Sequence, residues 1–232
     1  MKIIHVWCQF GEVDAETRRR NTVAQGSWYV LGLRDVLEVT SAMIHRDGRS
    51  IDPAYPAWFA TDIIDAAHLR KASDDDIILL TSADSGFMPG AMGEIIDAVR
   101  ASGSVHLRRR NFQRIDVPIT DHDYVKTGGD YPGMDGCAFT ASWWVNHREM
   151  FPDVLYGRQH WDGAMRNLIR WSGGTKLMDQ EWHEEHPAFW WSGKTNKANL
   201  HNERLLCAWI ANHGGSTLDY LYEDGEIGYA YV

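Results

Sequence analysis

Residues 74–85 read DDDIILLTSADS, and this stretch decides the fold that the sequence predicts. Three aspartates precede a run of four large aliphatic residues, 77–80. A short, continuously apolar run predicts a strand that is buried on both faces, as in a parallel sheet between two layers of helices. The small and polar residues 81–85 follow at once, so the strand should end in a tight turn that carries Asp84.

Segments on both sides of this strand alternate between strand and helix patterns. The first half predicts strands at 3–8, 36–39, 77–80 and from 105 onward, with helices at 14–31, 58–69 and after Pro89. Such alternation predicts an α/β fold with a mainly parallel central sheet flanked by helices. The second half predicts a polar loop and then a smaller mixed part, with the loop at 113–134, strands at 136–141 and 175–178, and helices at 143–150, 161–171 and 199–212. We expect a single domain over residues 1–232.

Composition narrows the class of protein. The chain has 232 residues, of which 44% are hydrophobic, and this suits one globular α/β domain. No apolar run approaches the ~18 residues of a membrane span, and we interpret the N-terminus as a first strand instead of a signal peptide. Three scattered cysteines predict reduced thiols in a cytoplasmic protein.

The net charge of −9 argues against a general nucleic-acid binder, because phosphate contacts need local lysine and arginine. Two arginine triplets, 18–20 and 108–110, are local exceptions. Each triplet either forms an ion-paired surface or binds phosphate, and the sequence leaves both alternatives open.

Asp84 is the first candidate for chemistry. Ligands of parallel α/β sheets bind outside the carboxyl ends of the strands, so the loops at 9–12 and 82–85 should face one cleft. A carboxylate held there could bind Mg²⁺ or Mn²⁺ and neutralise a diphosphate leaving group. The alternative is an aspartate that only stabilises a turn.

The second candidate is the segment His183-Glu184-Glu185-His186. A zincin helix needs histidines four residues apart, whereas these are three apart and Pro187 follows directly. One histidine that binds a metal or a phosphate fits better, and surface polar residues are the alternative.

Asp162 is the third candidate, because it lies at the start of a predicted helix. It could accept the proton of an attacking hydroxyl, although aspartate is also a favoured N-cap residue. The neighbouring Trp161 could pack against a sugar. At the first helix, Gln9, Thr17 and Arg20 could approach a nucleotide, since helix N-termini favour anions.

Taken in order, these segments resemble small GT-A-like glycosyltransferases, including members from bacteria and phages. The resemblance covers residues 1–202 and depends on three motifs. Thr81-Ser82-Ala83-Asp84 is similar to a strand-end "T-N-S-D", Gly157-Arg158 to Trp161-Asp162 matches "G-R-x-x-W-D", and His183 to His186 matches "H-x-x-H". Ser82 stands where a full D-x-D signature has its first aspartate.

The resemblance implies roles for individual residues. Asp84, His183 and His186 would bind the metal, and Asp162 would be the catalytic base of an inverting enzyme. The nucleotide sugar would be bound within residues 1–112 and the acceptor within 113–232. The implied donor-binding residues are Gln9, Thr17, Arg20, Ser82, Asp84, Arg158 and Trp161, and the implied acceptor-binding residues are Trp143, Trp144, Trp190 and Trp191.

The expected activity is the transfer of a sugar from a nucleotide diphosphate, such as a UDP-sugar, to an acceptor hydroxyl with Mn²⁺ or Mg²⁺ as cofactor. The acceptor is a glycan or a hydroxymethylated base in phage DNA. Two alternatives stay open, namely a non-catalytic module that binds a nucleotide or a sugar, and a metal-dependent hydrolase that uses His183 and His186.

Overall fold

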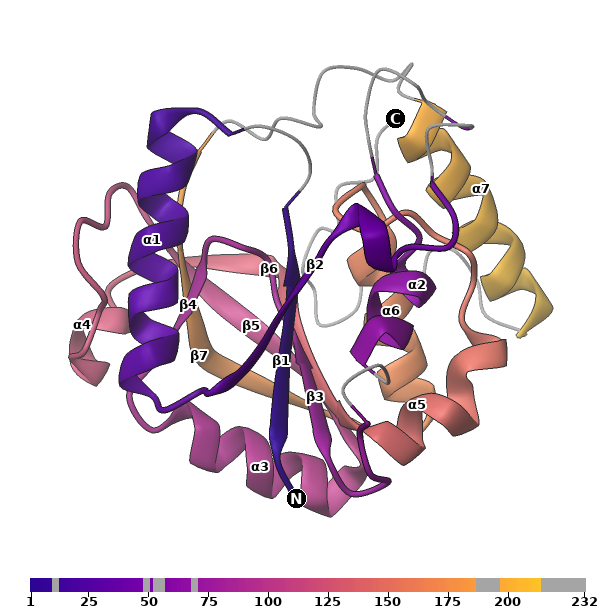
Figure 1. The fold of residues 1–232 in the computed structure, drawn as a ribbon, viewed down its shortest axis with the longest axis horizontal. Coiled ribbons are helices and arrows are strands. Elements are labelled where there is room, and N and C mark those ends of the chain that lie inside the picture. The colour runs from indigo at the N-terminus through magenta and orange to yellow at the C-terminus, as the bar shows by residue number, and fades with distance from the viewer. Residues whose placement is uncertain (10–12, 48–50, 52–56, 68–70, 187–196, 214–232) are drawn as a thin grey trace.

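The structure, a computed structural model, describes residues 1–9, 13–47, 51, 57–67, 71–186 and 197–213 (Figure 1). The strands are β1 (Ile3–Cys8), β2 (Asp35–Val39), β3 (Ile77–Leu80), β4 (Ser85–Phe87), β5 (Ser104–Phe112), β6 (Gly129–Thr140) and β7 (Thr175–Glu184). The helices are α1 (Ala15–Val30), α2 (Ala60–Asp65), α3 (Ala91–Ser102), α4 (His122–Val125), α5 (Ala141–His147), α6 (Trp161–Trp171) and α7 (Lys197–Asn212). Short 3-10 turns lie at Ser41–Met43 and Arg148–Met150. The predicted α/β class is confirmed.

The apolar run at 77–80 forms β3, and all four of its side chains are buried. Ile78 and Leu80 join the core on one face of the sheet, whereas Ile77 and Leu79 join the core on the other. A strand between two apolar layers needs apolar residues at every position. The prediction of a strand that is buried on both faces is therefore confirmed.

The sheet is mixed, so the expectation of a mainly parallel sheet is not confirmed. Its strand order is β2-β1-β3-β6-β5-β7-β4. β1 is parallel to β2 and β3, and β5 is parallel to β7. β6 is antiparallel to both β3 and β5, and β4 is antiparallel to β7.

The observed strands differ from the predicted ones in residues 113–134, whose glycines and prolines predict a loop. Its last part belongs to the 12-residue strand β6, which also includes the predicted strand 136–141 up to Thr140. Pairing with β5 holds residues 129–134 extended, whereas β3 pairs only with residues 137–140, so tertiary pairing overrides weak local propensity. β7 likewise continues to Glu184, well beyond the predicted end at 178.

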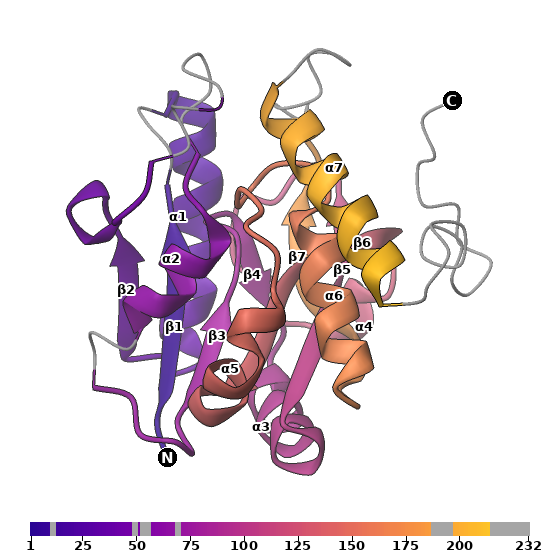
Figure 2. The same ribbon diagram turned by 90° about the vertical axis from the view of Figure 1, so that its right-hand side faces the viewer.

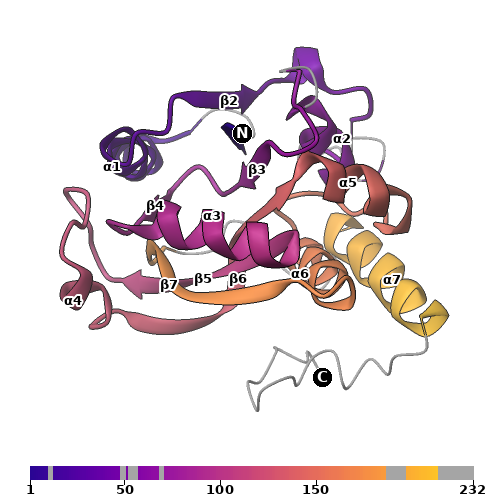
Figure 3. The ribbon, with the colours of Figure 1, turned by 90° about the horizontal axis from the view of Figure 1, so that it is seen from below.

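Helices cover the two faces of this sheet. α1 and α3 share one core with residues of β3, β5 and β7, and Figure 3 shows β2 and β3 on one side of α3 with β5 and β7 on the other. α2, α5, α6 and α7 share the second core (Figure 2). Within the described residues, no helix is long and apolar enough to cross a membrane.

The chain changes direction at β1. From β1 it continues through α1 to β2 on one side, and later returns to β3 on the other side of β1. The carboxyl ends of β1 and β3 therefore form a topological switch point, where ligands of α/β sheets bind. Asp84 follows β3 at this edge.

Trp143 and Trp144, which the resemblance assigns to acceptor binding, lie in the core. Trp144 is fully buried and donates Nε1 to Asp65, while Trp143 is 6% exposed and donates Nε1 to Ser172. They pack with Phe139 of β6 because α5 presents its apolar side to the sheet. Both side chains therefore pack in the core, and their acceptor role stays a prediction. Trp190 and Trp191 lie outside the described residues.

Candidate metal-binding site

Three side chains from distant parts of the sequence converge at the carboxyl edge of the sheet. Nε2 of His186 lies 3.0 Å from Oδ2 of Asp84, and Nε2 of His183 lies 3.3 Å from the same oxygen. One ligand atom from each of the three residues lies within 4.8 Å of the others. The structure thus brings together the three residues that the sequence assigns to a metal.

Pairing between β4 and β7 explains this convergence. β4 begins directly after Asp84, and it pairs antiparallel with β7 so that Ser85 lies opposite His183. Residues next to each other across an antiparallel pair lie about 5 Å apart, so Asp84 falls within reach of His183. His186 follows three residues later and approaches Asp84 from the end of β7.

A bulge in β7 sets which of its residues reach this edge. Leu107 of β5 lies opposite Leu177, but Arg109 lies opposite Glu181, so β7 contains two extra residues over this span. Asp179 has a φ of +61° within the bulge, and its Oδ1 accepts a hydrogen bond of 2.6 Å from Nε of Arg110. Bulges redirect side chains next to functional sites, and this one sets the register of Glu181 and His183.

The protonation states of the cluster suit metal binding. Burial favours the neutral form of Asp84, but the two nearby imidazoles outweigh it and hold the pKa of Asp84 well below its usual value. Burial and the positive charge of Arg109 together lower the pKa of His183 to about 4, although Asp84 opposes this shift. At neutral pH the site therefore offers a carboxylate and a neutral imidazole, the forms that bind metals.

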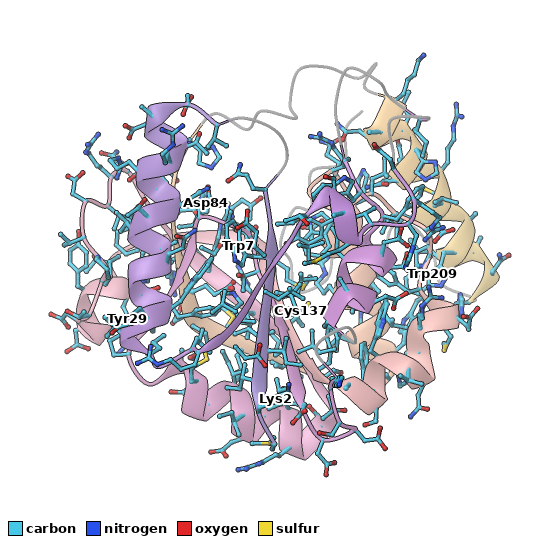
Figure 4. The ribbon with its side chains drawn as sticks, viewed as in Figure 1. Lys2, Trp7, Tyr29, Asp84, Cys137 and Trp209 are labelled. Atoms are coloured by element: carbon cyan, nitrogen blue, oxygen red, sulfur yellow. The ribbon has the colours of Figure 1, made fainter. Side chains whose placement is uncertain are left out.

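Asp84 lies beside α1 (Figure 4), and Nε of Arg20 on this helix is 4.0 Å from Oδ2 of Asp84. Its Nη2 donates a hydrogen bond of 2.8 Å to the hydroxyl of Thr17. Gln9, directly after β1, accepts a hydrogen bond from Asn21 of α1. Thr17 and Arg20 thus lie on α1, and Gln9 lies just after β1. Of these three candidates, Arg20 is the one with a contact to Asp84.

Ser82 contributes to the turn that carries Asp84. Its hydroxyl lies 2.7 Å from the hydroxyl of Ser85, which in turn donates to Oδ2 of Asp135 at 3.4 Å. Ser82 therefore links the turn to β6.

Arg109, Asp135 and Glu181 form a second group on this side of the sheet that sequence reasoning missed. Arg109 forms a close ion pair with Asp135, and its guanidinium lies 3.9 Å from the ring centre of Tyr131. Glu181 is fully buried, and among the described residues neither of its carboxyl oxygens has a hydrogen-bond partner. Burial raises the pKa of Glu181 to about 8, although Arg109 opposes this shift. A Cβ atom at Gly136 would lie 2.0 Å from Oε1 of Glu181, so this glycine makes room for the carboxyl.

One signal in the sequence could have located Glu181. Residues two apart on a strand point to the same face, so a strand that includes His183 also directs residue 181 toward the site. The residue pattern predicts a strand that ends at 178, so it indicates no alternation at residues 181 and 183.

Asp162 is the second residue of α6 and does not cap the helix. The N-cap is His160, which has a φ of +71°, and Oδ1 of Asp162 accepts the backbone N–H of Gly163 at 2.8 Å. Asp162 is only partly buried. Its charge also acts on the guanidinium of Arg109, whose pKa burial lowers while Tyr131, Asp84, Glu181 and Asp162 oppose that shift.

Trp161 and Arg158 are buried, at 8% and 7% exposed. The Trp161 ring packs 4.3 Å from the ring of Tyr156, whose hydroxyl donates to the carbonyl of Thr81 at 2.9 Å. Trp161 thus links α6 to the end of β3, and its contact with a sugar stays a prediction.

Most of the arginines in the two triplets are ion-paired. Arg108 pairs with Asp130, Arg109 with Asp135 and Arg110 with both Asp179 and Asp130. In the first triplet, Arg19 pairs with Glu16 and Glu184. For residues 108–110 the structure supports the ion-paired alternative.

A cavity of about 520 Å³ lies apart from the metal-binding cluster and contains none of its three residues. It is lined by Ile51, Lys197, Leu200, His201, Arg204 and Leu205. His201 contacts the carbonyl of Asp153 through Nε2 at 2.9 Å and does not join the cluster.

No known protein family matches this sequence, and no curated protein matches it either. The interpretation of the site therefore depends on its own geometry and chemistry.

Proposed function

We propose that this chain is a metal-dependent, GT-A-like glycosyltransferase that moves a sugar from a nucleotide diphosphate to an acceptor hydroxyl. One observation carries the proposal, namely the convergence of Asp84, His183 and His186 at the switch point between β1 and β3. A nucleotide bound at such a point directs its diphosphate toward the carboxyl ends of the strands. A cation held there would meet that diphosphate.

The three side chains fit a divalent ion. Bonds of about 2.1 Å to one ion place neighbouring ligand atoms roughly 3 Å apart. The contacts of 3.0 and 3.3 Å to Asp84 are close to this spacing. Imidazole suits Zn²⁺, Cu²⁺, Fe²⁺ and Ni²⁺ best, whereas Mn²⁺ and Mg²⁺ suit oxygen ligands. The proposed Mn²⁺ or Mg²⁺ would therefore depend on the carboxylate of Asp84 and on oxygens of the diphosphate.

Each nearby residue has a role in this reaction. When bound, the ion neutralises the charge that develops on the leaving diphosphate. Arg20 lies beside Asp84 and adds a donor for a phosphate oxygen. Asp162, at the start of α6, accepts the proton of the attacking hydroxyl.

Replacing Asp84 by Asn tests this function. Asn keeps the shape of the side chain but removes the charge, so we expect loss of Mn²⁺ binding, sugar transfer and nucleotide-sugar hydrolysis. Wild type and variant should be compared by release of nucleotide diphosphate from UDP-glucose and GDP-mannose with Mn²⁺. Wild-type activity in Asp84→Asn would refute the proposal, provided that its circular dichroism spectrum is unchanged.

We favour a glycan over modified DNA as the acceptor. All three arginines at 108–110 have acidic partners, and the chain has a net charge of −9. A DNA-modifying enzyme would need uncompensated cations for phosphate contacts.

A metal-dependent hydrolase is the second candidate, because two histidines and one carboxylate also form the ligand set of catalytic zinc sites. Metal analysis of the purified protein separates the two functions. One equivalent of tightly held zinc, together with hydrolysis that needs no nucleotide sugar, would favour the hydrolase.

A further inference from the structure

Arg109 and Asp135 form an ion pair, and its position in the fold suits the binding of a ligand. Arg109 lies on β5 and Asp135 on the neighbouring strand β6, where the pairing of the two strands is irregular. The hydroxyls of Ser82 and Ser85 connect Asp135 to the turn that carries Asp84. The pair is therefore joined to the metal-binding turn by a continuous chain of contacts.

The pair is also held in one geometry and stays partly open. The guanidinium of Arg109 lies against the ring of Tyr131, and its Nε donates to Oδ1 of Asn111 at 2.9 Å. The side chains of Arg109 and Asp135 are 11% and 18% exposed. Groups fixed before a ligand arrives lose little entropy on binding, so this pair is preorganised for recognition.

The surrounding charges decide which kind of ligand fits. Arg109 already contacts Asp135, and Asp84, Glu181 and Asp162 lie near enough to influence it electrostatically. A phosphate placed here would meet one compensated cation and several carboxyl groups. A neutral polyhydroxyl group avoids this repulsion. A carboxylate only accepts hydrogen bonds and a guanidinium only donates them, whereas a hydroxyl does both. The hydroxyls of such a ligand can therefore donate to Asp135 and accept from Arg109.

The place of the pair beside the metal-binding cluster indicates which part of the donor it could contact. Asp135 is joined through Ser85 to the turn that carries Asp84, and Arg109 lies opposite Glu181, two residues before His183. The sugar in transit must lie between the diphosphate on the metal and the attacking hydroxyl near the base. We propose that Arg109 and Asp135 bind hydroxyl groups of the transferred sugar and so select the donor sugar. This inference rests on the proposed function.

Comparing ligands with and without the sugar tests the inference. Isothermal titration with Mn²⁺ should measure UDP-glucose against UDP, and GDP-mannose against GDP, for wild type, Arg109→Met and Asp135→Asn. Loss of hydrogen bonds to a charged group should weaken nucleotide-sugar binding about 10- to 100-fold. Binding of the nucleotide diphosphate alone should change by less than about twofold, because it lacks the sugar. Arg114→Met is the matched control, since Arg114 is 60% exposed and pairs with Asp116.

The double variant Arg109→Met/Asp135→Asn guards against misfolding, because it leaves no uncompensated buried charge. It should show the same selective loss with a normal circular dichroism spectrum. Equal weakening of UDP and UDP-glucose would overturn the inference and leave the transferase proposal standing. Wild-type protein that binds none of the four nucleotides in the presence of Mn²⁺ would overturn both.

Discussion

His183 and His186 approach the same oxygen of Asp84 from different surroundings. The side chain of His183 is 7% exposed, and that of His186 is 27% exposed. A buried ligand is held by its neighbours, whereas a more exposed one loses rotamer freedom when it binds an ion. The two histidines should therefore contribute unequally to the affinity for metal.

We expect His183→Ala and His186→Ala each to weaken Mn²⁺ binding at least about tenfold, with the larger loss for His183→Ala. Isothermal titration with MnCl₂ measures this directly. His201→Ala serves as control, because His201 contacts a backbone carbonyl outside the cluster. Unchanged Mn²⁺ affinity in both cluster variants would show that the histidines do not bind the ion.

Asp76 has a structural role at the start of β3. It is buried and accepts hydrogen bonds from the backbone N–H groups of Lys2 and Ser73 and from the Ser73 hydroxyl. Burial alone would raise the pKa of Asp76, but these hydrogen bonds outweigh it and the pKa is lowered. The carboxylate thus ties the start of β1 to the start of β3.

The lowered pKa predicts a pH-dependent loss in Asp76→Ala. A carboxyl group with a folded pKa below its unfolded value of about 3.9 stabilises the protein above that value and loses this effect as pH falls through the folded pKa. We expect Asp76→Ala to lower the free energy of unfolding by roughly 1.5–3 kcal/mol at pH 7. Urea denaturation at pH 7 and near pH 3 should show the difference from wild type shrinking in acid. A difference that stays constant would contradict the assigned role.

At the scale of elements, the bulge in β7 determines the site. Two extra residues in β7 place Glu181 opposite Arg109 and His183 opposite Ser85. Without them, the residues that face β4 and β5 at this edge would shift by two positions. The metal ligands therefore depend on residues that do not touch the metal.

Asp179→Val should disturb this bulge. A β-branched residue at a φ of +61° is strained by about 1–3 kcal/mol, and the change also removes one of the two acidic partners of Arg110. We expect lower thermal stability and weaker Mn²⁺ binding. Asp179→Gly adopts the same backbone conformation without strain, so its Mn²⁺ affinity should stay closer to wild type. Equal Mn²⁺ affinities in wild type and Asp179→Val would show that metal binding does not depend on the bulge.

At the scale of the whole molecule, ligand binding should raise the melting temperature, because it stabilises the native state by mass action. Ligand at about 100 times its Kd adds roughly 2.7 kcal/mol, which corresponds to roughly 5–10 °C for a domain of this size. We expect this shift with Mn²⁺ and UDP together in wild type and not in Asp84→Asn. Differential scanning fluorimetry measures it, and equal shifts in both proteins would contradict binding at Asp84.

Local patterns in the sequence predicted the α/β class and the doubly buried strand β3, and the resemblance to GT-A-like glycosyltransferases implied the three candidate metal ligands. Each of these depends on neighbours along the chain, such as the run at 77–80 or the turn that ends at Asp84. The mixed sheet, the burial of Trp143 and Trp144, and the Arg109, Asp135 and Glu181 group could not be found in this way.

Only the tertiary structure decided these features, because each depends on contacts between residues far apart in the chain. A strand rich in glycine has little preference of its own, and β6 is extended because β3 and β5 supply its hydrogen-bond partners. Likewise, the local sequence around Asp84 and around His183 does not predict that the two residues lie close together. Pairing of β4 with a bulged β7 brings residues 84 and 183 together, and the sequence specifies that pairing only through the whole fold.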